Sequence, residues 1–583
     1  MKKILVLLIA GLSLSSCDFS NYILEQDYDF TTTFEKSGGT ETGTYTEVID
    51  FYEDLAAVYP SIDLQIFGET DSGKPLHLMV YSRDKNFDFK KLREDHTVIL
   101  INNGIHPGES DGIDATMMLF RDLAQDSIVL PENTVIATIP IYNVGGALNR
   151  NSFSRTNQNG PKSYGFRGNA RNFDLNRDFI KADTRNTRTF YEIFHHVNPD
   201  VFIDTHVSNG ADYQYTLTHL FTQHDQMGGQ LGKYIKTDLR PALEKALAKK
   251  KWDITPYVNV FGDVPEKGFS QFLDTPRYST GYTSLWNTLG MMIETHMLKP
   301  YDQRVRGTYE ILRSMIDITD EDSQLIKKLR AQDFKEFQAK RSYAFGFQVD
   351  STQTSGLQFK GYEAERLPSE VTGFERLKYD TSKPFNREVT YYDSFKPSKE
   401  VAMPQGYIIP QGWWPVLELL DLNKVKMLPF EKDTTMLVEV YRIENYETRQ
   451  NAYEGHYPHS NVAVESSMQK VDIRKGDFFV PVKQRAAKYI MATLEPQAPD
   501  SFFSWNFFDS VLQQKEGFSP YVFEEVAREI LDDYPEIEDE FMALKESDEE
   551  FASNWYAQLD WIHKKSEHYE TSHLRYPIFR VNR

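Results

Sequence analysis

The sequence predicts an α/β fold, in which a mixed, largely parallel sheet is flanked by helices and followed by a β-rich unit and C-terminal helices. Helical and apolar strand patterns alternate over residues 46–330, which is typical of parallel sheets with helical crossovers. Short strand patterns separated by Pro and Gly follow over residues 331–500, and helical patterns return in residues 501–583. We therefore expect three folded regions with these boundaries.

The composition is that of a globular, acidic protein. The 583 residues are 40% apolar and 14% aromatic, which is ample for full-sized cores. Lys and Arg number 65 against 86 Asp and Glu, giving a formal net charge of −21. This balance lacks the basic footprint of a nucleic-acid binder, and we expect no nucleic-acid partner.

The N-terminus has the organisation of a secretion signal. Lys2 and Lys3 precede an apolar segment that ends near Leu14, too short for an ordinary membrane-spanning helix. Leu14-Ser15-Ser16-Cys17 is similar to the bacterial lipobox, whose cysteine is lipidated after residues 1–16 are removed. The alternative is an ordinary signal that is cleaved nearby without lipidation.

Cys17 is the only cysteine in the chain, so an internal disulfide is impossible and an anchoring role explains this residue best. Residues 17–45 are rich in Thr, Gly, Glu and Ser, and we expect them to form a flexible tether. The prediction is an exported protein, lipid-anchored to a bacterial membrane and facing the periplasm or the cell surface.

The folded part is expected to begin with an amphipathic helix. Residues 46–59 carry apolar side chains at helical spacing, with Thr46 as the expected cap and Pro60 as the end. Two strands follow, near residues 64–67 and 76–82, joined by the turn-forming run GETDSGKP.

Three further strands end in residues that can bind a metal or carry a proton. The β-branched run at residues 98–101 is followed by His106 and Glu109, the strand 200–206 ends in His206, and the strand 290–294 ends in Glu294. A helix at 113–124 and a strand at 135–141 lie between them. Ligands collect at the carboxyl ends of parallel strands, so these side chains are expected to meet.

Together these residues fit a catalytic zinc site. Zinc in such sites takes three protein ligands, which His106, Glu109 and His206 can provide, and keeps one position open for water. Glu294 can then serve as the general base. Taken singly, each histidine could be a structural core residue and Glu294 a buried carboxylate paired with an arginine. The order of all four favours the metal site.

The loop at residues 149–179 is dense in Asn and Gly and contains five arginines. The run Asp174-Leu175-Asn176-Arg177 is embedded in it. Because arginine binds carboxylates bidentately and can stabilise an oxyanion, the loop indicates a substrate with an anionic group.

These motifs resemble those of the zinc carboxypeptidases over roughly residues 46–330. The family pattern is H-x-x-E, an arginine, D-x-N-R, a histidine after a strand and a distant glutamate. Here it is matched by His106 to Glu109, Arg155, Asp174 to Arg177, His206 and Glu294. The segment GETDSGKPLHLMVYS also looks like the start of the family's catalytic domain.

The resemblance implies one Zn²⁺ per chain, held by His106, Glu109 and His206, with Glu294 activating its water. It implies that Arg155 polarises the scissile carbonyl and stabilises the oxyanion. Asn176 and Arg177 would grip the free carboxylate of a peptide, and Tyr278, or alternatively Tyr282, would close over it.

The C-terminal half predicts a different architecture. Strands are expected at 436–442, 461–465 and 478–482, an arrangement compatible with a sandwich, and helices at 522–531 and 549–563. Glu454, His456 and His459 make a second metal site conceivable, but no fourth donor is obvious. We expect this half either to bind cell-wall or dietary peptides or to buttress the catalytic domain.

Three functions remain in competition. The leading one is a lipid-anchored zinc metallopeptidase that hydrolyses peptide bonds at or near a free C-terminus. A related zinc amidohydrolase would act on cell-wall peptides or N-acyl amino acids. A non-catalytic surface lipoprotein would bind glycans or peptides through its 33 Tyr and 7 Trp. A pure binder has no need of four such donors, which argues against the last.

Overall fold

The structure is a computed structural model that describes residues 28–582. The predicted signal peptide, Cys17 and the first part of the expected tether lie outside these residues. Within residues 28–582, none of the helices combines the length and the apolar character that crossing a membrane requires.

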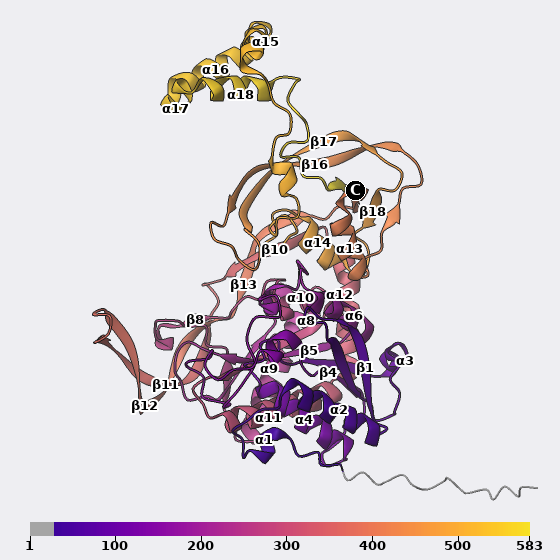
Figure 1. The fold of residues 1–583 in the computed structure, drawn as a ribbon, viewed down its shortest axis with the longest axis vertical. Coiled ribbons are helices and arrows are strands. Elements are labelled where there is room, and N and C mark those ends of the chain that lie inside the picture. Colours follow the sequence, from indigo (N-terminus) through magenta and orange to yellow (C-terminus); the bar gives the residue numbers. More distant parts are fainter. Residues whose placement is uncertain (1–27, 583) are drawn as a thin grey trace, which may run out of the picture.

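An eight-stranded mixed sheet organises the N-terminal unit, which we define as residues 28–339 (Figure 1). Its strands lie in the order β1-β2-β4-β3-β5-β9-β6-β7, with the four central strands β4, β3, β5 and β9 parallel. Strand β2 pairs antiparallel with both β1 and β4, and β6 pairs antiparallel with β9. The predicted mixed, largely parallel sheet is confirmed. Its strands are β1 (Ile62–Glu69), β2 (Pro75–Tyr81), β3 (Thr97–Asn102), β4 (Thr134–Ile139), β5 (Val201–Ser208), β6 (Leu217–Phe221), β7 (Ile254–Pro256) and β9 (Leu289–His296).

Helices cover both faces of this sheet because the central strands are apolar on both sides. Along β3, Ile99 and Ile101 pack into one core with helices α2, α4 and α11, whereas Val98 and Leu100 pack into a second core with α6 and α10. The helices are α2 (Tyr45–Val58), α4 (Asp111–Ala124), α6 (Arg185–Val197), α9 (Arg240–Lys249), α10 (Ser279–Ser284), α11 (Tyr301–Glu321) and α12 (Ser323–Ala339).

The start of the described chain differs from the sequence expectation. Residues 28–44 pack against the rest of the N-terminal unit, with Phe34 only 1% exposed on the short helix α1 (Thr33–Lys36). Although most residues of this segment are polar, the aromatic side chains of Tyr28, Phe30 and Phe34 supply the apolar area that packs there.

Helix α2 begins at Tyr45, which is two residues earlier than the expected cap at Thr46 implies. Its cap is Thr44, whose hydroxyl accepts from the backbone N–H of Glu47 while the Glu47 carboxylate accepts from the backbone N–H of Thr44. This reciprocal capping box satisfies two otherwise unpaired donors, and Thr46 lies exposed within the first turn.

A two-stranded ribbon and a long hairpin inserted between its strands connect the N-terminal unit to the rest. Strand β10 (Ser342–Val349) pairs with β13 (Phe395–Ala402), and β11 (Ser355–Pro368) pairs with β12 (Glu375–Tyr392). The β11–β12 hairpin projects to the left in Figure 1. Its base returns to the N-terminal unit, where β12 pairs in parallel with β8 (Phe269–Ser270).

A six-stranded sheet forms the accessory unit, which we define as residues 404–512 with 575–582. The strand order is β15-β18-β14-β19-β16-β17, so the last strand of the chain lies in the middle of the sheet. Helices α13 (Trp414–Leu422) and α14 (Ala487–Leu494) pack beside it. The strands are β14 (Gly406–Ile409), β15 (Leu428–Pro429), β16 (Thr434–Thr448), β17 (His459–Ile473), β18 (Phe478–Pro481) and β19 (Phe579–Val581).

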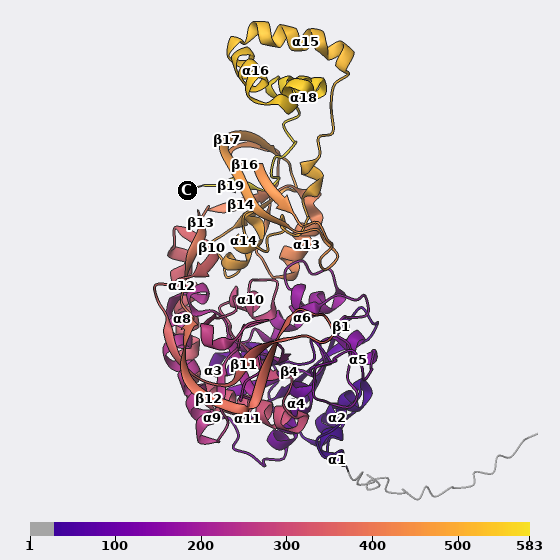
Figure 2. The same ribbon diagram turned by 90° about the vertical axis from the view of Figure 1, so that its left-hand side faces the viewer.

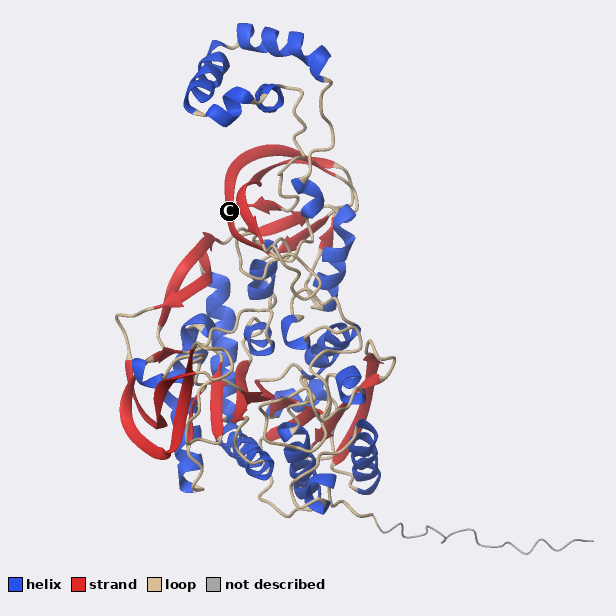
Figure 3. Cartoon of the chain, turned by 60° about the vertical axis from the view of Figure 1, so that its left-hand side comes forward, coloured by secondary structure: helices blue, strands red, loops and turns tan. Residues whose placement is uncertain are grey.

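Four helices stand apart from this sheet and pack around a small apolar core of their own (Figures 2 and 3). We call them the helical arm, α15 (Pro520–Asp533), α16 (Pro535–Ser547), α17 (Glu549–Ser553) and α18 (Trp555–Lys565). The predicted helix at 549–563 is interrupted at Asn554, whose side chain caps α18 by accepting from the N–H of Ala557. After the arm the chain returns to the accessory sheet as β19.

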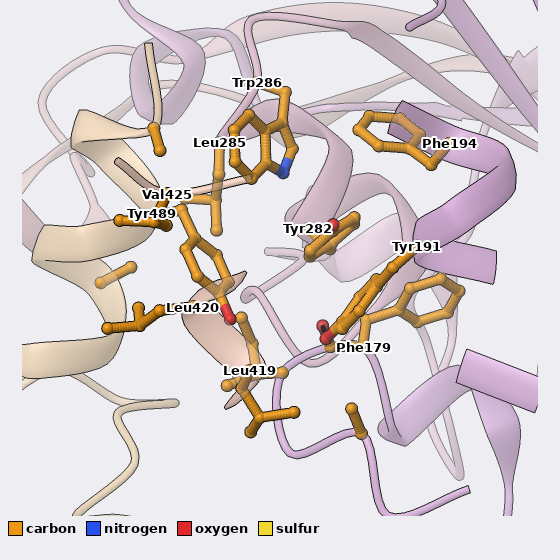
Figure 4. Close-up of a cluster of buried hydrophobic side chains, with 14 of the residues drawn as sticks. Phe179, Tyr191, Phe194, Tyr282, Leu285, Trp286, Leu419, Leu420, Val425 and Tyr489 are labelled. Atoms are coloured by element: carbon orange, nitrogen blue, oxygen red, sulfur yellow. Dashed lines mark hydrogen bonds between the residues drawn. The ribbon is translucent and has the colours of Figure 1, made fainter. Parts of the chain in front are cut away.

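The N-terminal and accessory units share one apolar core. Figure 4 shows Tyr282 of α10, and Trp286 just after that helix, facing Tyr489 of α14 and the leucines of α13. Trp286 stacks on Tyr489 with ring centroids 5.6 Å apart, and the hydroxyl of Tyr282 donates to Asn423 over 2.6 Å. The accessory unit therefore packs on the side of the main sheet that α10 covers.

Candidate active site

Two adjacent parallel strands bring His106, Glu109 and His206 together. His106 and Glu109 follow β3 in a tight turn, in which the Glu109 N–H donates to the carbonyl of His106, and His206 lies on the neighbouring strand β5. One ligand atom from each of the three lies within 4.8 Å of the others. All three are buried, with exposures of 3 to 4%.

The orientation of the two imidazoles suits a metal ion. Nδ1 of each ring lies 3.3 Å from the Glu109 carboxylate, so these nitrogens converge. Nε2 of His106 lies 2.9 Å from Asp174, and Nε2 of His206 lies 3.0 Å from Asp204. A carboxylate on the far nitrogen is the usual way to orient a metal-binding histidine.

Nδ1 of His106 is buried and has no hydrogen-bond partner in the described chain. A buried nitrogen left without a partner is costly, and a cation beside the Glu109 carboxylate would remove that cost. Two imidazoles and a carboxylate are also a donor set that zinc accepts. The residues present therefore fit the metal, and in residues 28–582 they form the single such cluster.

Gly108 makes room for an arginine next to this cluster. A Cβ at this position would lie 2.2 Å from Nε of Arg155, closer than real contacts allow. Arg155 donates to the Glu109 carboxylate at 2.7 Å, and Arg167 lies 3.6 Å from the same group. Burial by itself would raise the pKa of Glu109, but the charges of Arg155 and His106 outweigh it and hold this pKa well below its usual range.

Glu294 faces the cluster from strand β9. It is the register partner of His206 on the adjacent parallel strand, so both side chains point to the same side of the sheet. Burial raises the pKa of Glu294 to about 8, a rise that the charge of His206 opposes and that of Glu109 reinforces.

The turn at residues 174–177 places Asn176 and Arg177 on the same wall. The Asp174 carboxylate caps it by accepting from the N–H of Asn176, and the amide oxygen of Asn176 accepts from the N–H of Ser279 at 3.0 Å. The guanidinium of Arg177 lies 4.5 Å over the ring of Tyr278. This turn is therefore attached to the loop that carries the tyrosine.

A cavity of about 600 Å³ connects these side chains. All eight residues that the sequence singles out for binding or catalysis line it: His106, Glu109, Arg155, Asn176, Arg177, His206, Tyr278 and Glu294. Tyr282, the alternative to Tyr278, is fully buried in the core instead.

Sequence reasoning did not assign a role to several residues of the site. Asp204 lies two positions before His206 on the same strand and hence on the same face, a spacing that points to it. Asp274 lines the cavity, and burial raises its pKa to about 7. No local pattern marks Asp274, because its position comes from a loop.

The second metal site considered for the C-terminal half does not form. Glu454 accepts from the backbone N–H of Asp174, His456 pairs with Asp183, and the His459 ring lies against Asp509. The three side chains thus point to different partners.

The fold and the donor set define a metal-dependent hydrolase with its site at the carboxyl ends of parallel strands. Residues 48–210 match the model of the zinc carboxypeptidase family. The protein is a metallocarboxypeptidase-like hydrolase.

Curated relatives and solved structures are similar to this chain at low identity. Carboxypeptidase 2 of Trichophyton equinum is 22% identical over 468 residues, covering 75% of this chain and 78% of the relative. Its counterpart in Trichophyton rubrum is 23% identical over 455 residues, covering 72% and 75%. The metallo-carboxypeptidase of Burkholderia cenocepacia aligns with a TM-score of 0.36 and 15% identity, covering 48% of this chain and 69% of that one. Carboxypeptidase A of Helicoverpa armigera aligns with a TM-score of 0.36 and 14% identity, covering 48% and 74%.

Proposed function

We propose that this protein is a zinc carboxypeptidase that removes residues from the free C-terminus of peptides. The observation that carries this proposal is the convergence of the His106, Glu109 and His206 donor atoms beside a cavity that Arg177 also lines. The donors account for hydrolysis, and an arginine a short distance along the same cavity accounts for recognition of a terminal carboxylate.

His106, Glu109 and His206 would hold the zinc ion. When bound, zinc acts as a Lewis acid that polarises the scissile carbonyl and makes water more acidic. Asp174 and Asp204 support the ligands by fixing the rings of His106 and His206.

The remaining residues divide the reaction between them. A carboxylate oxygen of Glu294 accepts a proton from the attacking water and returns it to the leaving nitrogen. Arg155 stabilises the negative charge that develops on the carbonyl oxygen, and Arg177 with Asn176 binds the terminal carboxylate. Tyr278 closes the substrate side of the cavity.

The test combines metal content with peptide cleavage. Zinc-loaded protein is incubated with peptides that have free or amidated C-termini, and the products are followed by mass spectrometry. We expect stepwise loss of C-terminal residues from the free peptides only. Glu294→Gln should keep its zinc and lose about 10²- to 10⁴-fold in rate, the usual effect of removing a general base. His106→Ala should lose zinc as well.

Other outcomes distinguish the alternatives. Release of an acyl group or a cell-wall fragment would identify an amidohydrolase, and binding without turnover would identify a surface binding protein. Either result contradicts the carboxypeptidase proposal.

We also propose that the protein is exported and anchored to a bacterial membrane by a lipid on Cys17. The lipobox-like Leu14 to Cys17 and the single cysteine support this. Metabolic labelling with a fatty-acid analogue should mark the wild type and not Cys17→Ser. Equal labelling of both would refute the anchor.

A further inference from the structure

The tip of the β16–β17 hairpin, residues 453–456, reaches from the accessory unit to the back wall of the active site. The Glu454 carboxylate accepts from the backbone N–H of Asp174 at 2.9 Å. Nε2 of His456 lies 2.8 Å from the Asp183 carboxylate. These two contacts hold the hairpin tip against both ends of the segment that contains the predicted carboxylate-binding turn.

Between them, Tyr453 contacts Arg177. Nε of Arg177 donates to the Tyr453 hydroxyl at 3.0 Å, and Nη1 donates to the carbonyl of Asn176 at 2.8 Å. The face of the guanidinium lies 4.5 Å from the centre of the Tyr278 ring. In the described chain no hydrogen bond engages Nη2 of Arg177, so the edge that bears it remains for a ligand in the cavity that Arg177 lines.

Tyr453 is itself held by the accessory unit. Its ring stacks on Trp505 at an interplanar angle of 16°, with centroids 6.2 Å apart, and Trp505 is fully buried. Arg449 lies 4.5 Å over the Tyr453 ring. The hydroxyl that contacts Arg177 therefore has a position that the core of the accessory unit determines.

We propose that the accessory unit completes the site for the substrate's terminal carboxylate, with Tyr453 as a positioning residue that orients Arg177. The inference rests on the proposed carboxypeptidase function and adds a role for the C-terminal half. A guanidinium binds a carboxylate bidentately only when its plane and its free edge are correctly oriented. An arginine fixed through Nε loses less conformational freedom when the substrate arrives, so it binds more tightly.

The test is Tyr453→Phe in the full exported chain loaded with zinc, which keeps the stacked ring and removes only the hydroxyl. The matched control is Tyr457→Phe in the same loop, where the side chain is 52% exposed. For peptides with a free carboxylate we expect Tyr453→Phe to raise KM about three- to tenfold with little change in kcat, as lost ground-state binding requires. Tyr457→Phe should match the wild type, and all three proteins should have the same melting temperature.

A binding measurement separates this inference from the proposed function. In a zinc-loaded Glu294→Gln background, calorimetry compares one peptide as its free acid and as its amide. The background should prefer the acid, Tyr453→Phe should lose most of that preference, and Tyr457→Phe should keep it. A folded Tyr453→Phe with unchanged KM and unchanged acid preference would overturn the inference. Absence of terminal cleavage by the wild type refutes the proposed function, and the acid preference still decides the role of Tyr453.

Discussion

At the scale of single residues, the site depends on carboxylates that lie behind the donors as much as on the donors. Asp204 is fully buried, receives a hydrogen bond from Asn102 at 3.1 Å and another from Ser279, and lies 3.0 Å from Nε2 of His206. This arrangement fixes the ring so that Nδ1 faces Glu109. The orientation of the metal-binding side chains thus depends on neighbouring residues that do not themselves bind the metal.

Asp204→Asn should weaken zinc binding about 10- to 100-fold, the usual effect of removing an outer carboxylate from a metal-binding histidine. Zinc affinity is measured by competition with a chromogenic chelator. Asp263→Asn, at a surface carboxylate that pairs with Lys267, is the control and should leave the affinity unchanged. Equal affinities for the wild type and Asp204→Asn would show that His206 needs no such support.

At the scale of elements, the start of α2 depends on a capping box that shifts the helix from its expected beginning. Thr44→Ala should lower the free energy of unfolding by about 1 kcal/mol, because the N–H of Glu47 loses its partner. Thr46→Ala is the matched control, since Thr46 is exposed within the first turn. Urea denaturation measures both. If Thr46→Ala lowered the free energy of unfolding more than Thr44→Ala, Thr44 would not be the cap.

Helices α4 and α11 meet at a buried carboxylic acid. Asp114 of α4 accepts a hydrogen bond from Tyr301 of α11, and burial raises the pKa of Asp114 to about 7. The neighbouring charge of Asp111 adds to the rise. Arg150 and Tyr52 also face this carboxyl group. The folded protein therefore holds a proton on Asp114 that the unfolded chain releases near pH 3.8.

Stability should consequently fall as pH rises from about 4 to about 7 and then level off, because the folded state binds more protons than the unfolded state in that interval. A pKa raised from 3.8 to about 7 corresponds to at most about 4 kcal/mol. Asp114→Asn cannot ionise and should lack this dependence. The measurement is the difference in unfolding free energy between wild type and variant at several pH values. A difference that stays constant from pH 4 to 7 would contradict the assignment.

At the scale of the whole molecule, the fold of the accessory unit depends on the last strand, β19, but not on the helical arm. The arm packs around its own core, whereas β19 lies between β14 and β16 and carries Arg580, which pairs with Glu495 and Glu439. The arm is thus an insertion in the accessory unit. The accessory sheet is complete only when the chain returns from the arm as β19.

Replacing residues 518–566 by a short flexible linker should leave zinc binding, and the melting temperature of the remaining protein, nearly unchanged. Truncation after residue 512 removes the arm and β19 together, and should give an aggregated or strongly destabilised protein. The buried Ile408 and Val438 would then lose the strand beside them. Calorimetry and size-exclusion chromatography compare the two. Equal behaviour of the two deletions would refute the role of β19.

The sequence by itself determined the class of the sheet and the identity of the chemical groups. Continuous apolar runs and strand-end donors are local patterns, and His106, Glu109, His206 and Glu294 follow from them because neighbouring parallel strands end at one edge of a sheet. The tertiary structure alone decided which tyrosine lines the cavity, since Tyr278 and Tyr282 lie four residues apart in similar surroundings along the chain. It also decided that Tyr453 contacts Arg177 across 276 positions. Such a contact depends on how two units share a core, and no short-range periodicity records it.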